Sequence, residues 1–500
     1  MTHFTWLDYG IFFGYLAAAV LVGVLFVREQ HTIKDYFLAS RSMGFILVGV
    51  SVLAALFSGI SYLGAPSEAY MHSASFVIFG LSFFIATPIT TQLFVPRFYQ
   101  SRFYTAYQYL EERFSVQVRL LSSSLFILRV LLWLALATYA PALALEQVTG
   151  LPLWFSILCT GILTTTYTTL GGMKAVIWTD VMQFVVLLGG QFVILWVALS
   201  RIPDGLAGVY EIGRSAGKLD LSLSLDPSVR VTLWGLLIGG AVINLVQLAT
   251  DQVSVQRYLT ATSMKEAQRS LWLKLVLLVP VFIIFYGTGL VLYAFYHTHG
   301  DPLASGRISR PDQILPYFVV NELPRGLPGL LIAAIYAGTM SVTSSGINAL
   351  TTATLMDFYQ RLSTRQLSER AQLKFARCLT VGYGALVILL AFGVSKLGTL
   401  LEASNKAIGL VGGPLLGIFF LGILIKRATP WGAIVGWAAG VATLVPVSFR
   451  TKTSFLWLGV VGCGVTVLVG WIASLLISFM RPPPSPAQGS VSALEEDKAG

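Results

Sequence analysis

The 500-residue sequence is short of charge, because only 11% of its residues are charged whereas 55% are hydrophobic. A soluble domain carries about 25% charged residues, so there is too little charge here to cover a water-facing surface. Its three cysteines, Cys159, Cys378 and Cys463, fall inside apolar segments and show neither a disulfide framework nor a metal-binding spacing. No histidine lies in the middle of an apolar segment, and no HExxH helix is present. We therefore expect a membrane protein that is not an enzyme.

Long apolar runs are abundant instead, such as Gly10 to Val27, which contains no charge. About 20 predominantly apolar residues span a bilayer as a helix. Runs this long and continuous indicate helices rather than a barrel, because backbone groups in lipid must be satisfied internally. The sequence predicts an all-α membrane protein of about 13 transmembrane helices, centred near residues 18, 55, 86, 134, 162, 187, 243, 284, 342, 383, 411, 438 and 467.

The distribution of basic residues predicts the topology of these helices. The first segment lacks a basic n-region and a cleavage site, so we interpret it as a retained helix. Most Lys and Arg residues fall in alternate loops, chiefly 97–119, 257–274 and 361–377, which predicts an outside N-terminus and a cytoplasmic C-terminus in the plasma (inner) membrane. This topology, rather than nucleic-acid binding, accounts for the net charge of +10.

Two segments carry clusters of glycine and polar residues that predict broken helices. The second contains Ser51, Ser58, Gly59 and Ser61, and the seventh contains Gly239, Gly240, Asn244, Gln247, Thr250 and Asp251. They occupy matching positions in two possible five-helix halves, an arrangement typical of transporters with inverted repeats. The alternative is that small residues only allow helices to pack closely.

This pattern predicts five parts of the chain. An extra helix and an inside loop occupy residues 1–44, and the first repeat with an outside loop occupies 45–228. The second repeat covers 229–428, and two further helices cover 429–480. The tail 481–500, with its proline run and acidic end, is expected to be disordered and cytoplasmic.

Hydroxyl groups in the ninth segment suggest a cation site. Ser341, Ser344 and Ser345 share one helix face by their spacing. Several oxygen ligands suit a hard cation such as sodium, although Ser side chains also bond the preceding turn of their own helix. Asp180, entering the sixth segment, is the expected carboxylate partner, and pairing with Lys174 or helix capping is the alternative. Polar groups at membrane depth are costly and tend to be functional.

The chain also resembles the sodium:solute symporter family, in stretches that follow the family order from about residue 35 to about residue 430. These stretches are Ala65–Tyr70, Thr105–Phe114, Tyr139–Leu143, Gly171–Asp180, Gln252–Tyr258 and the ninth segment through Asn348. The resemblance implies a five-plus-five inverted-repeat, LeuT-like core. It also implies sodium-coupled symport of a sugar, sugar acid or monocarboxylate into the cell by alternating access. Sodium is then a co-transported ion, and neither nucleic acid nor an obligatory protein partner is expected.

The resemblance also assigns two sodium sites. The main site uses carbonyls of the broken second helix with carbonyl and hydroxyl oxygens of the ninth, here Ala54, Phe57, Gly338 and Ser341. The family has a Ser or Thr at the next position, where this chain has Val342, whose methyl groups cannot coordinate a cation. We expect this loss to weaken the main site. The second site, present in some members, corresponds to Asp180, Ser341, Ser344 and Ser345.

Solute contacts are implied at seven positions: Ser58, Ser61, Trp133, Asn244, Gln247, Asn405 and Lys406. Each of the polar side chains has hydrogen bonding between helices as an alternative role. Trp133 stands where the sialic-acid symporter has its carboxylate-binding arginine, so sialic acid is not the expected solute. Arg129, one turn nearer the inside, is expected either to bind an anion or to pair with a polar group.

Two other interpretations stay open from the sequence. Val342 allows a proton-coupled or uncoupled transporter of the same fold. A membrane-embedded solute sensor is the alternative from another class, although nothing after residue 480 is long enough to fold as a signalling module.

Overall fold

The computed structural model describes residues 5–150, 152–364, 367–393 and 408–480, and within these residues it is helical without strands, which confirms the all-α prediction. The long helices are α1 (Trp6–Leu25), α8 (Val116–Thr149), α9 (Leu153–Leu199), α13 (Met264–His299), α15 (Leu327–Ala353), α17 (Glu369–Ala391), α20 (Pro430–Arg450) and α21 (Phe455–Met480). Shorter helices connect them or pair into spans: α2 (Ile33–Leu38), α3 (Phe45–Ala54), α4 (Gly59–Met71), α5 (Phe83–Ile89), α6 (Val95–Gln100), α7 (Tyr107–Arg113), α10 (Leu206–Ser215), α11 (Gly240–Leu245), α12 (Gln252–Tyr258), α14 (Ile314–Glu322), α16 (Gln360–Leu362) and α19 (Gly413–Leu424).

The count of thirteen spans is not confirmed. By length and composition, the described residues contain nine spanning helices, or up to eleven if each bent pair is one span. One reason is that α9, at 47 residues, joins the predicted fifth and sixth segments. Gly172 interrupts it with φ 57° and ψ −157°, and a Cβ there would lie 2.9 Å from the Tyr36 carbonyl oxygen. Another is that residues 394–407, which precede α19, lie outside the described residues.

Both predicted broken helices are confirmed. Helices α3 and α4 bend by 61° at the first break, and residues Gly235–Thr250 bend by 57° against α12 at the second. Each break ends in a capping side chain that starts the next helix. Ser58 Oγ accepts from the amides of Ile60 and Ser61, and Asp251 Oδ1 accepts from the amide of Val253 at 2.9 Å.

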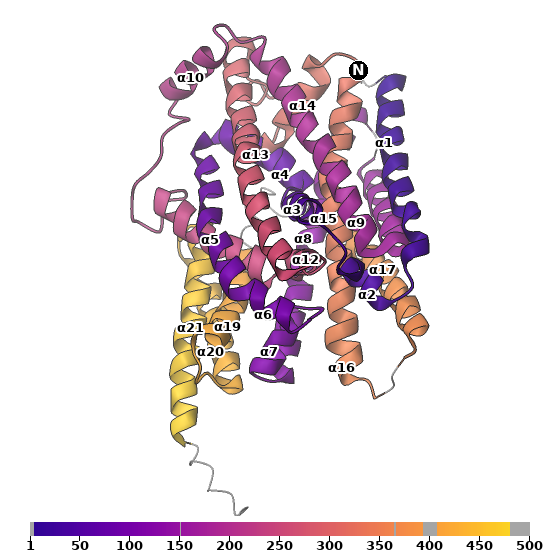
Figure 1. Ribbon diagram of the computed structural model, residues 1–500. Coiled ribbons are helices and arrows are strands. Elements are labelled where there is room, and N and C mark those ends of the chain that lie inside the picture. The colour runs from indigo at the N-terminus through magenta and orange to yellow at the C-terminus, as the bar shows by residue number, and fades with distance from the viewer. Residues whose placement is uncertain (1–4, 151, 365–366, 394–407, 481–500) are drawn as a thin grey trace, which may run out of the picture.

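Burial falls from the centre of the bundle to its edges. In the most apolar stretch of each membrane span, 94% of the residues are buried for the span of α15, but only 22% for that of α1 and 28% for that of α21. Helix α15 is therefore the central element. Figure 1 shows α1 at one edge and α19, α20 and α21 together at the opposite edge. Large apolar side chains on the outer surface, such as Trp196 and Phe449, are more than three-quarters exposed. This pattern fits a bundle surrounded by lipid.

The Thr105–Phe114 motif builds a polar network that joins three elements. Asp357 accepts from Thr105 Oγ1 at 2.7 Å, from Arg119 Nε at 2.8 Å and from Ser123 Oγ at 2.9 Å. Glu111 accepts from Arg119 Nη1 at 2.5 Å. This motif is therefore occupied by interhelical bonding, which ties α7 and α8 to the end of the α15 span. The division into repeats 45–228 and 229–428 stays a prediction.

Candidate ion and solute site

The break between α3 and α4 lies directly against α15. A Cβ built on Gly338 would lie 3.1 Å from the Ser58 carbonyl carbon and 3.2 Å from the Gly59 nitrogen. A Cβ on Gly59 would lie 2.4 Å from Thr339 Oγ1. Glycine at both positions lets the two backbones approach this closely. The break that carries Ala54 and Phe57 therefore meets the turn of α15 that starts at Gly338.

Ala54 and Ser341, two further residues predicted for the main sodium site, form hydrogen bonds with different partners. The Ala54 carbonyl accepts from the Phe57 amide at 3.1 Å, within the break. The Ser341 hydroxyl donates to Asp180 Oδ1 at 2.5 Å rather than to the break. Val342 lines a small inner cavity together with Ala55 and Leu56, so its methyl groups face the break. An oxygen at position 342 would point to this region.

Asp180, on α9, is the centre of a buried polar cluster that joins four helices. Besides Ser341, it accepts from Ser51 Oγ of α3 at 2.5 Å and from Arg257 Nη2 of α12 at 3.0 Å. Neither Asp180 nor Arg257 has an exposed side chain. Arg257 also donates to Ser51 Oγ at 2.9 Å and to Ser345 Oγ. The cluster holds one negative and one positive charge, so it is neutral as a whole.

The serines predicted for the second sodium site lie at this cluster. Ser344 Oγ donates to the Ser341 carbonyl at 3.0 Å, and Ser345 Oγ donates to the same carbonyl at 2.5 Å. Because each hydroxyl donates its proton to the helix, its lone pairs remain acceptors for a cation or for Arg257. The alternative pairing of Asp180 is not observed, since Lys174 pairs with Glu29. The sequence interpretation missed Arg257, although the residue stands in the Gln252–Tyr258 motif.

A central cavity of about 80 Å³ lies beside the first break, and four predicted solute residues line it. They are Ser61, Trp133, Asn244 and Gln247. Most of the remaining wall is aromatic, and of the described residues that line the cavity none is charged. The aromatic side chains come from three parts of the bundle and are Phe57, Phe76, Phe79, Phe83, Phe282 and Tyr286. Ser58 is not among the lining residues because it caps α4. Asn405 and Lys406 lie outside the described residues.

Asn244 is oriented by the hydrogen bonds around it. Its Nδ2 donates to Ser82 Oγ at 2.7 Å, and Ser82 Oγ donates in turn to the Phe79 carbonyl at 2.6 Å. Since the Ser82 hydroxyl donates its proton to that carbonyl, Asn244 Nδ2 must be the donor in the bond between Asn244 and Ser82. Its Oδ1 is buried and has no hydrogen-bond partner among the described residues. Asn244 Oδ1 is therefore an acceptor without a partner, on a residue that lines the central cavity.

A smaller cavity of about 40 Å³ shares Leu56, Trp133 and Gln247 with the central cavity, and an ion pair forms part of its wall. Arg129 Nη2 lies 2.6 Å from Asp251 Oδ2, and both residues line the smaller cavity. Of the two roles expected for Arg129, pairing with a polar group is therefore the one observed.

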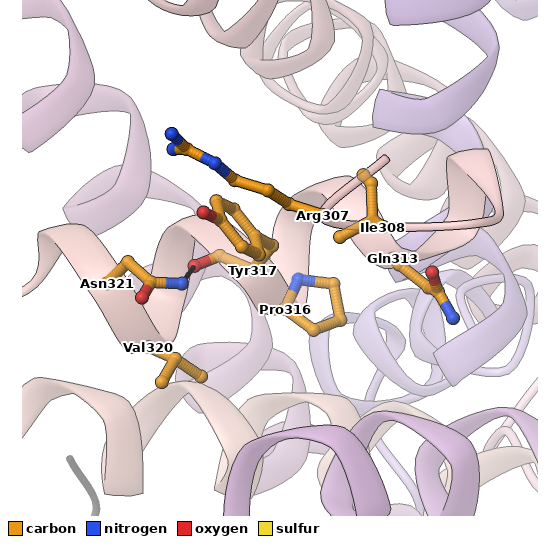
Figure 2. Close-up of a pocket in the computed structure, with 7 residues that line it drawn as sticks. All are labelled: Arg307, Ile308, Gln313, Pro316, Tyr317, Val320 and Asn321. Atoms are coloured by element: carbon orange, nitrogen blue, oxygen red, sulfur yellow. Dashed lines mark hydrogen bonds between the residues drawn. The ribbon is translucent and has the colours of Figure 1, made fainter. Parts of the chain in front are cut away.

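A third cavity, of about 310 Å³, lies over α14 and the loop before it. Figure 2 shows its lining, with Arg307 and Tyr317 close to each other and Asn321 bonded to the Tyr317 backbone. None of the predicted ion or solute residues lines this cavity. It is accordingly separate from the site at the helix breaks.

Comparison with known proteins gives matches along most of the chain. The model of the sodium:solute symporter family matches residues 36–440. The chain is 38% identical over 441 residues to sodium-coupled monocarboxylate transporter 1 of Homo sapiens, covering 87% of this chain and 72% of that protein. It is 33% identical over 540 residues to the sodium-dependent multivitamin transporter of Oryctolagus cuniculus, covering 97% and 84%. A substrate-bound, outward-open Na+-coupled sialic acid symporter matches with a TM-score of 0.87 at 32% identity, over 94% of this chain and 98% of that one.

Proposed function

Since this chain belongs to the sodium:solute symporter family, we propose that it carries a short monocarboxylate anion into the cell together with sodium. The family membership makes the protein a sodium-coupled symporter with a LeuT-like fold, not an enzyme. Among the three proteins compared, a sodium-coupled monocarboxylate transporter is the most identical in sequence, at 38%. The sialic acid symporter is 32% identical. The sequence resemblance implies that Trp133 stands in place of a carboxylate-binding arginine.

The size and lining of the central cavity support a short monocarboxylate as the solute. The cavity volume of about 80 Å³ is well below the roughly 300 Å³ at which pockets for drug-sized ligands begin. Its wall offers the polar side chains of Ser61, Asn244 and Gln247 among many aromatic rings, of which Tyr286 and Trp133 carry one polar group each. A sugar buries many hydroxyl groups that each need a partner, and unpaired ones are costly. A short carboxylate has fewer polar atoms and an apolar end that suits the rings.

The free acceptor of Asn244 refines the proposal. Its Oδ1 accepts no hydrogen bond from the described residues, so a hydroxyl donor on the solute would satisfy it. A 2-hydroxy monocarboxylate such as lactate carries that donor next to its carboxylate. We therefore expect lactate to bind more tightly than propionate, which has the same chain length without the hydroxyl.

For the ion, we propose that the cluster around Asp180 provides the main coupling site. It combines a carboxylate with the hydroxyls of Ser341, Ser344 and Ser345, which are the oxygen ligands that sodium prefers. The site at the break lacks the oxygen that Val342 replaces. Sodium would compete with Arg257 for the oxygens of Asp180, so binding would loosen the contact between α9 and α12. This competition gives a physical route from ion binding to movement of the second broken helix.

The chain is a multi-pass membrane protein, and we propose the plasma (inner) membrane as its location. The segments 97–119, 257–274 and 361–377 are rich in Lys and Arg, which supports an inside position for them. Arg119, Arg257 and Lys274, at the ends of these segments, are buried in the bundle and do not count towards this argument. On this topology the N-terminus is outside and the C-terminus cytoplasmic. Solute and sodium are the proposed partners, and no obligatory protein partner is proposed.

Uptake into proteoliposomes tests the function. We expect an inward sodium gradient to drive accumulation of radiolabelled lactate, and an equal potassium gradient not to do so. Unlabelled pyruvate should compete, whereas galactose, sialic acid and biotin should not. Competition by a sugar without competition by any monocarboxylate would show that the solute class is wrong. Equal uptake in sodium and potassium would show that the coupling is wrong.

A further inference from the structure

Four basic side chains are buried in the described part of the chain: Arg119, Arg129, Arg257 and Lys274. The three arginines lie within 3.0 Å of a carboxylate oxygen. Lys274, in α13, has no exposed surface, and its Nζ has no hydrogen-bond partner among the described residues. It is the one buried basic side chain of this set that has no carboxylate partner among the described residues.

Lys274 lies against the wall of the central cavity. Its Nζ is 3.2 Å from the centroid of the Phe83 ring, and Phe83 lines the cavity. One and two turns further along α13, Leu278 and Phe282 line the same cavity. Residues four apart share a helix face, so Lys274 continues the face of α13 that forms this wall.

Burial at this position costs free energy that a lysine with only a packing role would not recover. A charged side chain inside the membrane costs free energy, and such residues tend to mark solute or ion pathways. The Phe83 ring compensates part of this cost through a cation–π contact, but a ring carries no net charge. A leucine or methionine would pack in the same place without desolvating an ammonium group. The alternative, a purely structural lysine, therefore leaves this buried amine without a partner unexplained.

We propose that Lys274 binds the carboxylate of the transported solute, an inference that rests on the proposed monocarboxylate function. A single positive charge balances a single carboxylate. The flexible four-carbon stem allows the ammonium group to turn from the Phe83 ring to the cavity edge beside Leu278. There it donates a charge-assisted hydrogen bond to the solute. Arg129 is less suitable for this role, because Asp251 already neutralises it and would repel an anion.

The test compares lactate with lactamide, its uncharged amide, in three variants. Lys274→Met removes the charge at similar length, and Lys274→Arg keeps the charge. Lys265→Met is the matched control, since Lys265 lies on the same helix and is exposed. Uptake of radiolabelled lactate under a sodium gradient gives KM, and thermal shift gives stabilisation by sodium, lactate and lactamide. Should Lys274→Met not purify as a monodisperse protein, Lys274→Gln carries the same test.

We expect the KM of Lys274→Met for lactate to rise about tenfold or more, because a hydrogen bond to a charged group is lost. Lactate and lactamide should then stabilise this variant equally, while stabilisation by sodium alone is unchanged. Lys274→Arg should still prefer lactate, and Lys265→Met should match the wild type. A wild-type KM and an intact preference for lactate in Lys274→Met would overturn the proposal and leave the proposed function standing. If the wild type itself does not respond to any monocarboxylate, the proposed function fails, and the role of Lys274 with it.

Discussion

Arg257 and Asp180 form an ion pair inside the bundle, with Nη2 and Oδ2 3.0 Å apart and neither side chain exposed. The pair joins α12, which follows the second helix break, to α9. Ser51 of α3, which precedes the first break, bonds to both partners. A single buried cluster therefore connects both broken helices, and any cation that binds Asp180 acts on all three elements.

The first prediction separates the structural role of Asp180 from its role in ion binding. Asp180→Asn leaves Arg257 buried without a counter-charge, and breaking a buried pair costs about 3–5 kcal/mol. We expect a lower melting temperature and loss of sodium-driven uptake. Both are measured on the purified protein, by thermal unfolding and in proteoliposomes.

The double variant Asp180→Asn with Arg257→Met is the control for this experiment. It removes both charges, so its stability should recover towards that of the wild type. Its sodium dependence should remain absent if Asp180 is an ion ligand. A double variant that regains sodium-driven uptake would show that Asp180 serves only to neutralise Arg257.

A second prediction concerns the residue that replaces a family hydroxyl. Val342→Ser adds an oxygen on the side of α15 that faces Ala55 and Leu56. We expect the sodium concentration for half-maximal stabilisation to fall about tenfold, equivalent to about 1.4 kcal/mol. Thermal shift over a sodium series measures it. Val342→Ala opens the same space without an oxygen and should not increase affinity. An equal gain in both variants would attribute the effect to space rather than to coordination.

The close contact between α15 and the first break gives a third prediction. In Gly338→Ala the new Cβ meets Leu187 Cδ1 at 2.8 Å and backbone atoms of Ser58 and Gly59 at 3.1 and 3.2 Å. The Leu187 side chain can turn away, but the backbone of the break must move by a few tenths of an ångström. We expect weaker sodium stabilisation and a melting temperature lower than that of the wild type. Gly287→Ala is the control, because no atom lies within 4 Å of its Cβ and alanine favours a helix by up to about 1 kcal/mol. Similar melting temperatures in the two variants would contradict the importance of this contact.

The helical fold and the two breaks could be predicted from the sequence because their signals are local. Apolar runs mark spans, and glycine and hydroxyl clusters mark the bends at Ser58 and Asp251. The count of thirteen spans is not confirmed, because the predicted fifth and sixth segments follow each other directly in α9, with only Gly172 between them in a non-helical conformation. Hydropathy reports composition, not where the helix axis turns.

The site was predictable only in part, since ion pairs depend on the packing of distant segments. Asp180 and the α15 serines were predicted from their types and spacing. In the structure Ser341 bonds to Asp180 and Ser345 accepts from Arg257, whereas Ser344 bonds to the Ser341 carbonyl of its own helix. Nothing local to Arg257 indicates that its partner is 77 positions earlier in the chain. That Lys274 Nζ has no hydrogen-bond partner among the described residues likewise cannot be predicted from the sequence, because it depends on which side chains the surrounding helices place near it.

A fourth prediction follows from the ion pair of Arg129 and Asp251, which lines the smaller cavity next to the central one and which we expect to hold that cavity closed. Arg129→Gln removes the counter-charge, so the inner cavity should open more often. Ser254 lines this cavity, and Ser254→Cys in a background without the native cysteines reports its accessibility. We expect a membrane-permeant thiol reagent to react about tenfold faster when Arg129 is Gln, matching a shift of about 1.4 kcal/mol towards the open form. Arg129→Lys keeps the charge and should react at nearly the rate of the Ser254→Cys parent. Equal rates in all three would mean that the pair does not hold the inner cavity closed.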